Sequence, residues 1–177
     1  MATAPVFIVV SGLPGSGKST VGAALAAARR LPLLDKDLIL EQLFDTLGVG
    51  DAAHRSRLSR AADTQLRQQA QQSLGAVIVS WWRHPASVQS TGTETAWLAD
   101  LPGAWVEVYC RCRPSIAVDR FLARRRHPGH LDRDKTRAAE RLRFEQLHAL
   151  GPLGLGRLIT VDTERPVDLP ALLRRLG

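Results

Sequence analysis

The 177-residue chain has the length of one ordinary domain, and 45% of its side chains are hydrophobic, enough for a complete core. No apolar stretch approaches the roughly 20 residues of a membrane-spanning helix, so the composition indicates a globular protein and no membrane partner. The net charge is +7, but the arginines are spread along the chain and aromatic residues make up only 5%. This distribution favours a small anionic partner over nucleic acid.

The first elements in chain order enclose a glycine-rich loop. Val6–Val10 is an apolar run that predicts a buried parallel strand, and the alanine-rich segment Val21–Arg30 predicts a helix. Between them, residues 12–20 read Gly-Leu-Pro-Gly-Ser-Gly-Lys-Ser-Thr and fit the P-loop pattern G-x-x-x-x-G-K-[ST]. In such loops the backbone N–H groups face phosphate oxygens, the lysine reaches the β- and γ-phosphates, and the following hydroxyl binds Mg²⁺.

We therefore predict a site for ATP or GTP with Mg²⁺; no motif distinguishes the two nucleotides. The predicted nucleotide-binding residues of the loop are Gly12, Pro14, Gly15, Ser16, Gly17, Lys18, Ser19 and Thr20, with Ser19 on the metal. The first strand has no basic segment before it and leads directly into this loop. We expect it to be a strand and not a signal peptide, and the protein to be cytoplasmic.

The rest of the chain continues the alternation of strands and helices. Strands are expected at Leu31–Leu34, Val77–Val79, Trp105–Cys110 and Leu158–Val161, and helices at Asp37–Leu47, Ala52–Leu74, Ser115–Arg126, Asp132–Leu150 and Leu169–Leu176. This order predicts an α/β three-layer sandwich with a five-stranded parallel sheet, whose strands all end at the edge that carries the site. We expect a single domain over residues 1–177, with a helical lid around 120–135 and a substrate-side helical region around 38–74.

Two carboxylates follow the second strand at the edge where the P-loop opens. Asp37 could accept the proton of a substrate hydroxyl, and Asp35 could hold Mg²⁺ through water. Either carboxylate could be the base, and Asp37 could instead cap the helix that follows. Glu41 lies one turn beyond Asp37 and could orient the base or contact the substrate.

An arginine cluster ends the predicted helix Ser115–Arg126. Arg120, Arg124 and Arg126 are expected to bind the nucleotide phosphates from a mobile lid, with Arg124 assisting catalysis. The Pro128–Gly129 pair would provide the hinge. The alternative is a solvated basic helix end that complements the helix dipole.

Other segments at the predicted edge carry weaker signals. Trp81, Trp82, Arg83 and His84 follow the third strand as candidate substrate contacts. The two adjacent tryptophans point different ways, so one could line a pocket, and a buried core tryptophan is the equal alternative. His84 could contact the substrate or lie on the surface. Residues 161–163 follow the last strand and could lie against a nucleotide base or form a plain turn. Cys110 and Cys112 are expected to be buried reduced thiols.

Taken together, these motifs resemble the small P-loop kinases, a group that includes chloramphenicol phosphotransferase, zeta toxins, gluconate kinase and the kinase domain of polynucleotide kinase. The similarity to chloramphenicol phosphotransferase-like proteins spans nearly the whole chain and includes Asp37, Glu41, Arg111-Cys112, Arg120 and Arg124. It implies transfer of the nucleotide γ-phosphate to a hydroxyl of a small molecule, often an antibiotic, with Asp37 as base.

The chain departs from this group at the end of the third strand, where Ser80 follows the Val77–Val79 run and an acidic residue is common. A motor-type ATPase depends on that acidic residue, so the departure disfavours such an activity. A polynucleotide or nucleoside end kinase and a non-catalytic nucleotide-binding module remain as alternatives. Self-association is left open.

Overall fold

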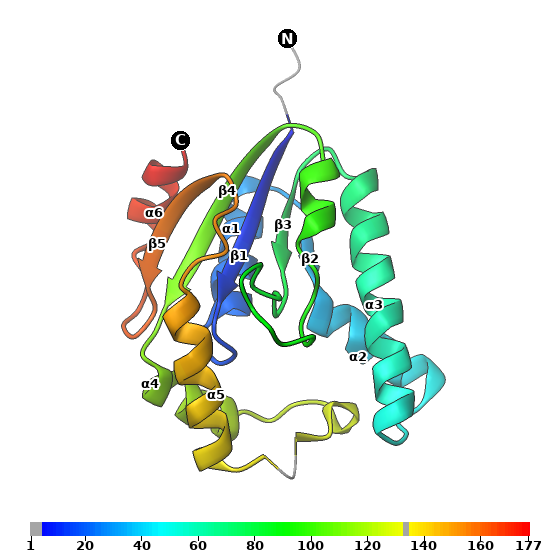
Figure 1. Cartoon of the computed structure of the whole chain (residues 1–177). Helices are drawn as coiled ribbons and strands as arrows, with labels where there is room; N and C mark the ends of the chain where they lie inside the picture. Colours follow the sequence, from blue (N-terminus) through cyan, green and yellow to red (C-terminus); the bar gives the residue numbers. More distant parts are fainter. Residues whose placement is uncertain (1–4, 133–134) are drawn as a thin grey trace.

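The computed structural model describes residues 5–132 and 135–177 as a five-stranded parallel sheet between layers of helices (Figure 1). The elements are β1 (Val6–Gly12), α1 (Lys18–Arg29), β2 (Leu33–Asp35), α2 (Lys36–Leu47), α3 (Ala52–Gln72), β3 (Ala76–Val79), η1 (Ala96–Asp100), β4 (Ala104–Arg111), α4 (Pro114–Ala123), η2 (Pro128–His130), α5 (Arg137–Leu150), β5 (Arg157–Asp162) and α6 (Leu169–Leu176). The strand order is β2-β3-β1-β4-β5. The predicted α/β sandwich with a five-stranded parallel sheet is confirmed.

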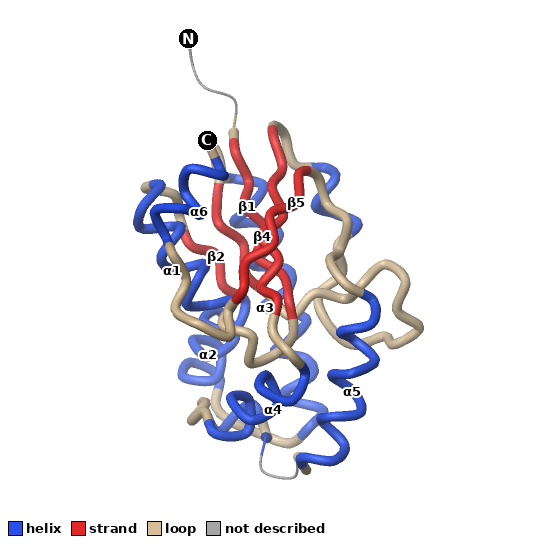
Figure 2. Tube along the Cα trace, turned by 90° about the vertical axis from the view of Figure 1, so that its left-hand side faces the viewer, coloured by secondary structure: helices blue, strands red, loops and turns tan. Residues whose placement is uncertain are grey.

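Both faces of the sheet are covered because successive side chains of each strand point to opposite sides. Ile8 and Val10 of β1 face the core that α1 and α6 close, whereas Phe7 and Val9 face the core closed by α2, α3 and η1. Figure 2 shows α1 and α6 together on one side of the strands. A third, smaller apolar cluster joins the loop after β1 to α4 and α5, through residues such as Leu13, Phe121 and Phe144.

The parallel register brings the strand ends to a common edge. Val10 pairs with Val79 of β3, Asp35 of β2 also pairs with Val79, and Gly12 pairs with Cys110 of β4. The loops after β1, β2 and β3 therefore start side by side. The chain that follows α4, as far as residue 132, passes beneath this edge toward α2 (Figure 1).

The segment expected to be a helical lid is mostly not helical. Helix α4 ends at Ala123, and Arg124 is already extended, with φ −72° and ψ 141°. The helix could not in any case continue through Pro128, which lacks an N–H and whose ring would clash with the carbonyl of Arg124 in a continued helix. Helix α5 begins at Arg137, not at Asp132 as the sequence suggests, and Thr136 accepts a hydrogen bond from the Ala139 N–H as its cap. Residues 133–134 of the expected lid lie outside the described residues.

Candidate active site

The P-loop joins β1 to α1 in a conformation that requires glycine. Gly12, Gly15 and Gly17 have φ values of 133°, 77° and 87°, a region that other residues rarely adopt. A Cβ on Gly15 would lie 2.2 Å from the carbonyl oxygen of Ala117, so α4 packs directly against the loop. Gly17 forms the N-cap of α1, which directs the positive end of that helix to the concave side of the loop.

Two side chains of the loop are arranged to receive an anion. The ammonium group of Lys18 is buried and donates hydrogen bonds to the carbonyl oxygens of Gly12 (2.9 Å) and Leu13 (2.7 Å). Burial lowers the pKa of Lys18 to about 8. The hydroxyl of Ser16 is buried and has no hydrogen-bond partner among the described residues. A phosphate group would supply an acceptor for the Ser16 hydroxyl and for the third N–H of Lys18, so the loop fits a nucleotide phosphate.

Asp35 begins α2 and also faces the P-loop. Its carboxylate accepts a hydrogen bond from the Asp37 N–H at 2.9 Å and is the N-cap of the helix, so Asp37 is not the cap. Burial raises the pKa of Asp35, while the nearby Ser19 hydroxyl acts in the opposite direction. This pairing places one hydroxyl and one carboxylate together, as donors of the kind that Mg²⁺ accepts alongside phosphate and water.

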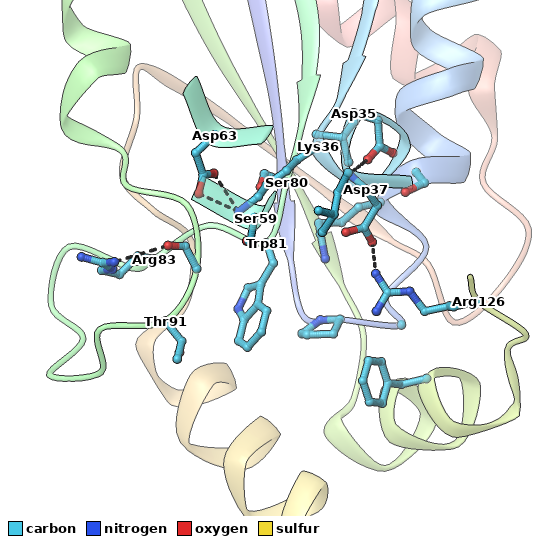
Figure 3. Close-up of a pocket in the computed structure, with 18 of the residues that line it drawn as sticks. Asp35, Lys36, Asp37, Ser59, Asp63, Ser80, Trp81, Arg83, Thr91 and Arg126 are labelled. Carbon is cyan, nitrogen blue, oxygen red and sulfur yellow. Dashed lines mark hydrogen bonds and ion pairs between the residues drawn. The ribbon is translucent and has the colours of Figure 1, made fainter. Parts of the chain in front are cut away.

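Asp37 lies one residue inside α2 and pairs with Arg126 across 2.5 Å (Figure 3). Arg126 also donates to Asp132 at 3.1 Å. Burial alone would raise the pKa of Asp37, but the positive charges of Arg126 and Arg124 act in the opposite direction, and the pKa is lowered. Asp37 is therefore ionised at neutral pH and can accept a proton.

A cavity of about 670 Å³ lies at the carboxyl edge and brings most of the sequence-predicted residues together. A space of this size fits a nucleotide or a small organic molecule. The predicted residues that line it are Pro14, Gly15, Gly17, Lys18, Ser19, Thr20, Asp35, Asp37, Trp81, Arg83, Arg120, Arg124 and Arg126.

Three of the proposed substrate contacts lie elsewhere. Trp82 is buried, donates from its indole nitrogen to the Val10 carbonyl at 2.9 Å and packs beside Trp97. His84 lies 3.0 Å from the carbonyl oxygen of Pro152. Glu41 lies 2.9 Å from the buried imidazole of His130. None of these three lines the main cavity, so none is carried into the proposed site.

The predicted arginines reach the cavity by different routes. Arg120 stays on α4 and donates to the Thr163 carbonyl at 2.8 Å, which ties α4 to the loop after β5. Arg124 lies beyond the helix end, with its guanidinium 4.6 Å from the centre of the Phe121 ring. Arg126 is held at Asp37, and the following turn packs on α2, where Phe44 stacks on His127 at 5.2 Å. The segment is thus docked on α2 in this structure, and its movement as a lid stays a prediction.

Several residues of the cavity were not singled out from the sequence. They lie on α2, α3 and the loops after β3, and comprise Lys36, Arg55, Ser56, Ser59, Arg60, Asp63, Ser80, Ser90, Thr91 and Gly92. The α3 residues could have been identified from the sequence, because Arg55, Ser59 and Asp63 recur every four residues and so form one polar face of the helix.

A second cavity, of about 600 Å³, lies on the other side of the P-loop beside α1 and the segment after β5. It shares Gly17, Thr20 and Arg120 with the main cavity. Most of its remaining wall is apolar and includes Val21, Ala24, Pro166, Val167, Leu169 and Leu172. This wall can accommodate a flat aromatic ring next to the phosphate loop.

The two cysteines are buried free thiols, in agreement with expectation, and they lie in different apolar clusters. Among residues 5–132 and 135–177, no group of three or more His, Cys, Asp or Glu side chains is placed to hold a metal ion. Within the same residues, no helix has the length and apolarity to cross a membrane.

The chain belongs to the family described as the AAA domain, whose model matches residues 7–148. A solved protein from Chloroflexus aurantiacus J-10-fl, provisionally described as a kinase, is 28% identical, with a TM-score of 0.78 over 98% of this chain and 97% of that one. A sugar kinase from Janibacter sp. HTCC2649 is 17% identical, with a TM-score of 0.56 over 99% and 92% of the two chains. Shikimate kinase from Acinetobacter baumannii, in complex with shikimate, is 16% identical, with a TM-score of 0.56 over 98% and 93%.

The last two structures show the shared fold alone. No curated protein matches the sequence. The resemblance to small P-loop kinases, expected from the sequence, is confirmed by the family match and by the similarity to the Chloroflexus protein.

Proposed function

We propose that this member of the AAA domain family is a small-molecule kinase, which transfers the γ-phosphoryl group of a nucleoside triphosphate to a hydroxyl group. The observation that carries the proposal is the position of Asp37. This ionised carboxylate lines the same cavity as Lys18 and the P-loop. A base in that position can reach a hydroxyl that attacks the γ-phosphorus.

Each group of the site has a role in this proposal. The P-loop N–H groups and Lys18 bind the β- and γ-phosphates, and the apolar cavity beside α1 receives the base of ATP or GTP. Ser19 and Asp35 would hold Mg²⁺, which would neutralise phosphate charge when bound with the nucleotide. Arg120 and Arg124 face the phosphates from the side of α4 and stabilise the charge that develops during transfer.

The transfer step places the proton on Asp37. The acceptor oxygen forms a bond to the γ-phosphorus while the bond to the β,γ-bridging oxygen breaks, so the nucleoside diphosphate leaves with that electron pair. Asp37 takes the hydroxyl proton as the new bond forms. Arg126 keeps the carboxylate ionised before the acceptor binds, and its ion pair must rearrange for the acceptor hydroxyl to reach Asp37.

The chemical class of the phosphate acceptor distinguishes a general small-molecule kinase from an antibiotic kinase and from a nucleic-acid end kinase. An antibiotic substrate, as in a self-resistance kinase, is the narrower form. Transfer should first be screened with ATP and GTP, with Mg²⁺, against sugars, sugar acids, hydroxylated antibiotics, nucleosides and 5′-hydroxyl oligonucleotides. Preferential phosphorylation of the oligonucleotides, with affinity that falls steeply as salt rises, would support the nucleic-acid end kinase instead.

The decisive experiment replaces Asp37 with asparagine. Asp37→Asn keeps the shape of the side chain and leaves the Asp35 cap intact, so nucleotide affinity should stay near the wild-type value. Turnover should fall by roughly 10²-fold or more, since the base is lost. Asp45→Asn is the matched control, because Asp45 also faces the 126–130 segment from α2, through His127, but does not line the cavity. Full turnover in Asp37→Asn would remove Asp37 as the base and favour Asp35.

A further inference from the structure

The cavity has a polar wall on α3 that the transfer step does not use. Arg55, Ser56, Ser59, Arg60 and Asp63 all line the cavity from this helix. The orientation of the helix is fixed by its other face, where Leu58, Ala62, Leu66 and Ala70 are buried against the sheet. The polar face is therefore held toward the cavity by core packing. Figure 3 shows two residues of this face, Ser59 and Asp63, beside the cavity.

The one carboxylate of this wall is already neutralised. Asp63 pairs with Lys36 at 2.7 Å and also accepts a hydrogen bond from Thr93 at 2.7 Å. Arg83, on the loop after β3, pairs with Glu94 at 3.0 Å. The charges of Asp63 and Lys36 thus neutralise each other, and Glu94 neutralises the charge of Arg83.

Arg55 and Arg60 are left without a counter-charge among the described residues. Arg60 donates to the hydroxyl of Ser56 at 3.1 Å, and neither arginine forms an ion pair there. The Nε atom of Arg55 is buried and makes no hydrogen bond within the described part of the chain. An unpaired buried donor is costly, and a guanidinium group is best satisfied by carboxylate or phosphate oxygens.

These cations are separate from those assigned to the nucleotide. Arg120 belongs to α4 and Arg124 directly follows it, whereas Arg55 and Arg60 belong to α3, which packs on α2 and β2. If the nucleotide phosphates lie at the P-loop, a second anionic group at the α3 wall would give the buried Nε of Arg55 the acceptor that it lacks. In the proposed reaction the acceptor is the other molecule that this cavity receives.

We propose that the phosphate acceptor is itself an anion, a hydroxylated carboxylate or phosphate ester. Arg55 and Arg60 bind its anionic group, and Ser56 and Ser59 bind its oxygens. Anchoring at this wall keeps the negative charge of the acceptor away from the P-loop while a hydroxyl is presented to Asp37. The inference rests on the proposed function in one respect, since it names the acceptor of that same reaction.

The test compares anionic molecules with their neutral counterparts. Binding of D-gluconate against D-glucitol, and of D-ribose 5-phosphate against D-ribose, is measured by calorimetry with a non-hydrolysable ATP analogue and Mg²⁺ at low ionic strength. At least one anionic probe should bind about tenfold or more tightly than its neutral partner, because charged hydrogen bonds are made to it alone. The two pairs distinguish a carboxylate from a phosphate ester.

Variants of α3 locate the effect. Arg55→Ala should abolish the preference for the anion, and Arg55→Lys should restore part of it. Arg57→Ala is the matched control, since Arg57 is exposed on the same helix, contacts His54 and does not line the cavity. Melting temperatures of all variants verify that they fold.

Failure of this inference is distinct from failure of the kinase proposal. Equal binding of each pair, weak binding of all four probes, or an equal loss in Arg57→Ala would overturn an anionic acceptor. Anion binding that depends on Arg55, without phosphoryl transfer that depends on Lys18, would leave the anion site on α3 standing but would refute the kinase, and with it the role of the bound anion as phosphate acceptor.

Discussion

Glu107 provides a sharp test of how the site is held in place. This glutamate of β4 is fully buried and accepts hydrogen bonds from the Ser11 hydroxyl at 2.5 Å and from the backbone N–H groups of Leu153, Gly154 and Leu155 at 2.8, 2.9 and 3.1 Å. It therefore joins the strand that enters the P-loop to the loop between α5 and β5. We predict that Glu107→Gln, a change of one atom, destabilises the protein markedly.

The size of the stability loss can be estimated from the hydrogen-bond donors that surround Glu107. The amide group of glutamine is best placed toward Ser11, whose hydroxyl can turn to accept from it, and the Leu153 N–H then faces another donor. One buried N–H without a partner costs about 1–3 kcal/mol, and the two remaining backbone bonds weaken as the acceptor loses its charge. Relief from burying a charge offsets part of this loss. The net expectation is about 2–3 kcal/mol.

The assay is equilibrium unfolding in urea, supported by thermal melting. A loss of this size should lower the melting temperature by about 5–10 °C for a chain of this length. Glu94→Gln is the control, because the Glu94 side chain is 70% exposed and should change stability by under about 0.5 kcal/mol. If Glu107→Gln costs no more than this control, the four hydrogen bonds do not hold the loop as argued.

The remaining predictions concern the loop and the proposed base. Arg126→Met should raise the pKa of Asp37, because the charge that contributes most to lowering this pKa is lost. The acid limb of the profile of kcat/KM against pH should then move to higher pH. An acid limb that does not move would contradict the role of the Arg126–Asp37 pair. Gly15→Ala should destabilise the protein and weaken nucleotide binding far more than Gly48→Ala, since both have positive φ but only Gly15 meets another residue's backbone; equal losses in urea unfolding would refute the close packing on α4. Nucleotide affinity should fall as the pH rises through about 8, the pKa of Lys18, because the neutral amine no longer attracts phosphate. Fluorescence titrations should show no such pH dependence of nucleotide affinity in Lys18→Arg. A wild-type affinity that does not change with pH would contradict the role of Lys18.

Features set by local pattern could be predicted from the sequence. The P-loop needs glycines, a lysine and a hydroxyl at fixed spacing, and the apolar strands need neighbours on both faces, so both patterns appear in consecutive residues. Parallel topology then placed Asp35 and Asp37 at the same edge as Lys18, since right-handed crossovers bring all strand ends together. The limits of two helices were less accurate, at Ala123 and Arg137, because several neighbouring residues could end or cap a helix and propensity alone does not choose among them.

Only the tertiary structure decided which polar side chains face the cavity. Trp81 and Trp82 are adjacent in sequence, yet one lines the cavity and the other bonds to β1, because consecutive residues near a strand end point in opposite directions. Lys36 and Asp63 are paired across α2 and α3, and Glu107 meets donors more than forty residues away. Such pairings depend on chain segments that meet only after folding, and no spacing in the sequence encodes them.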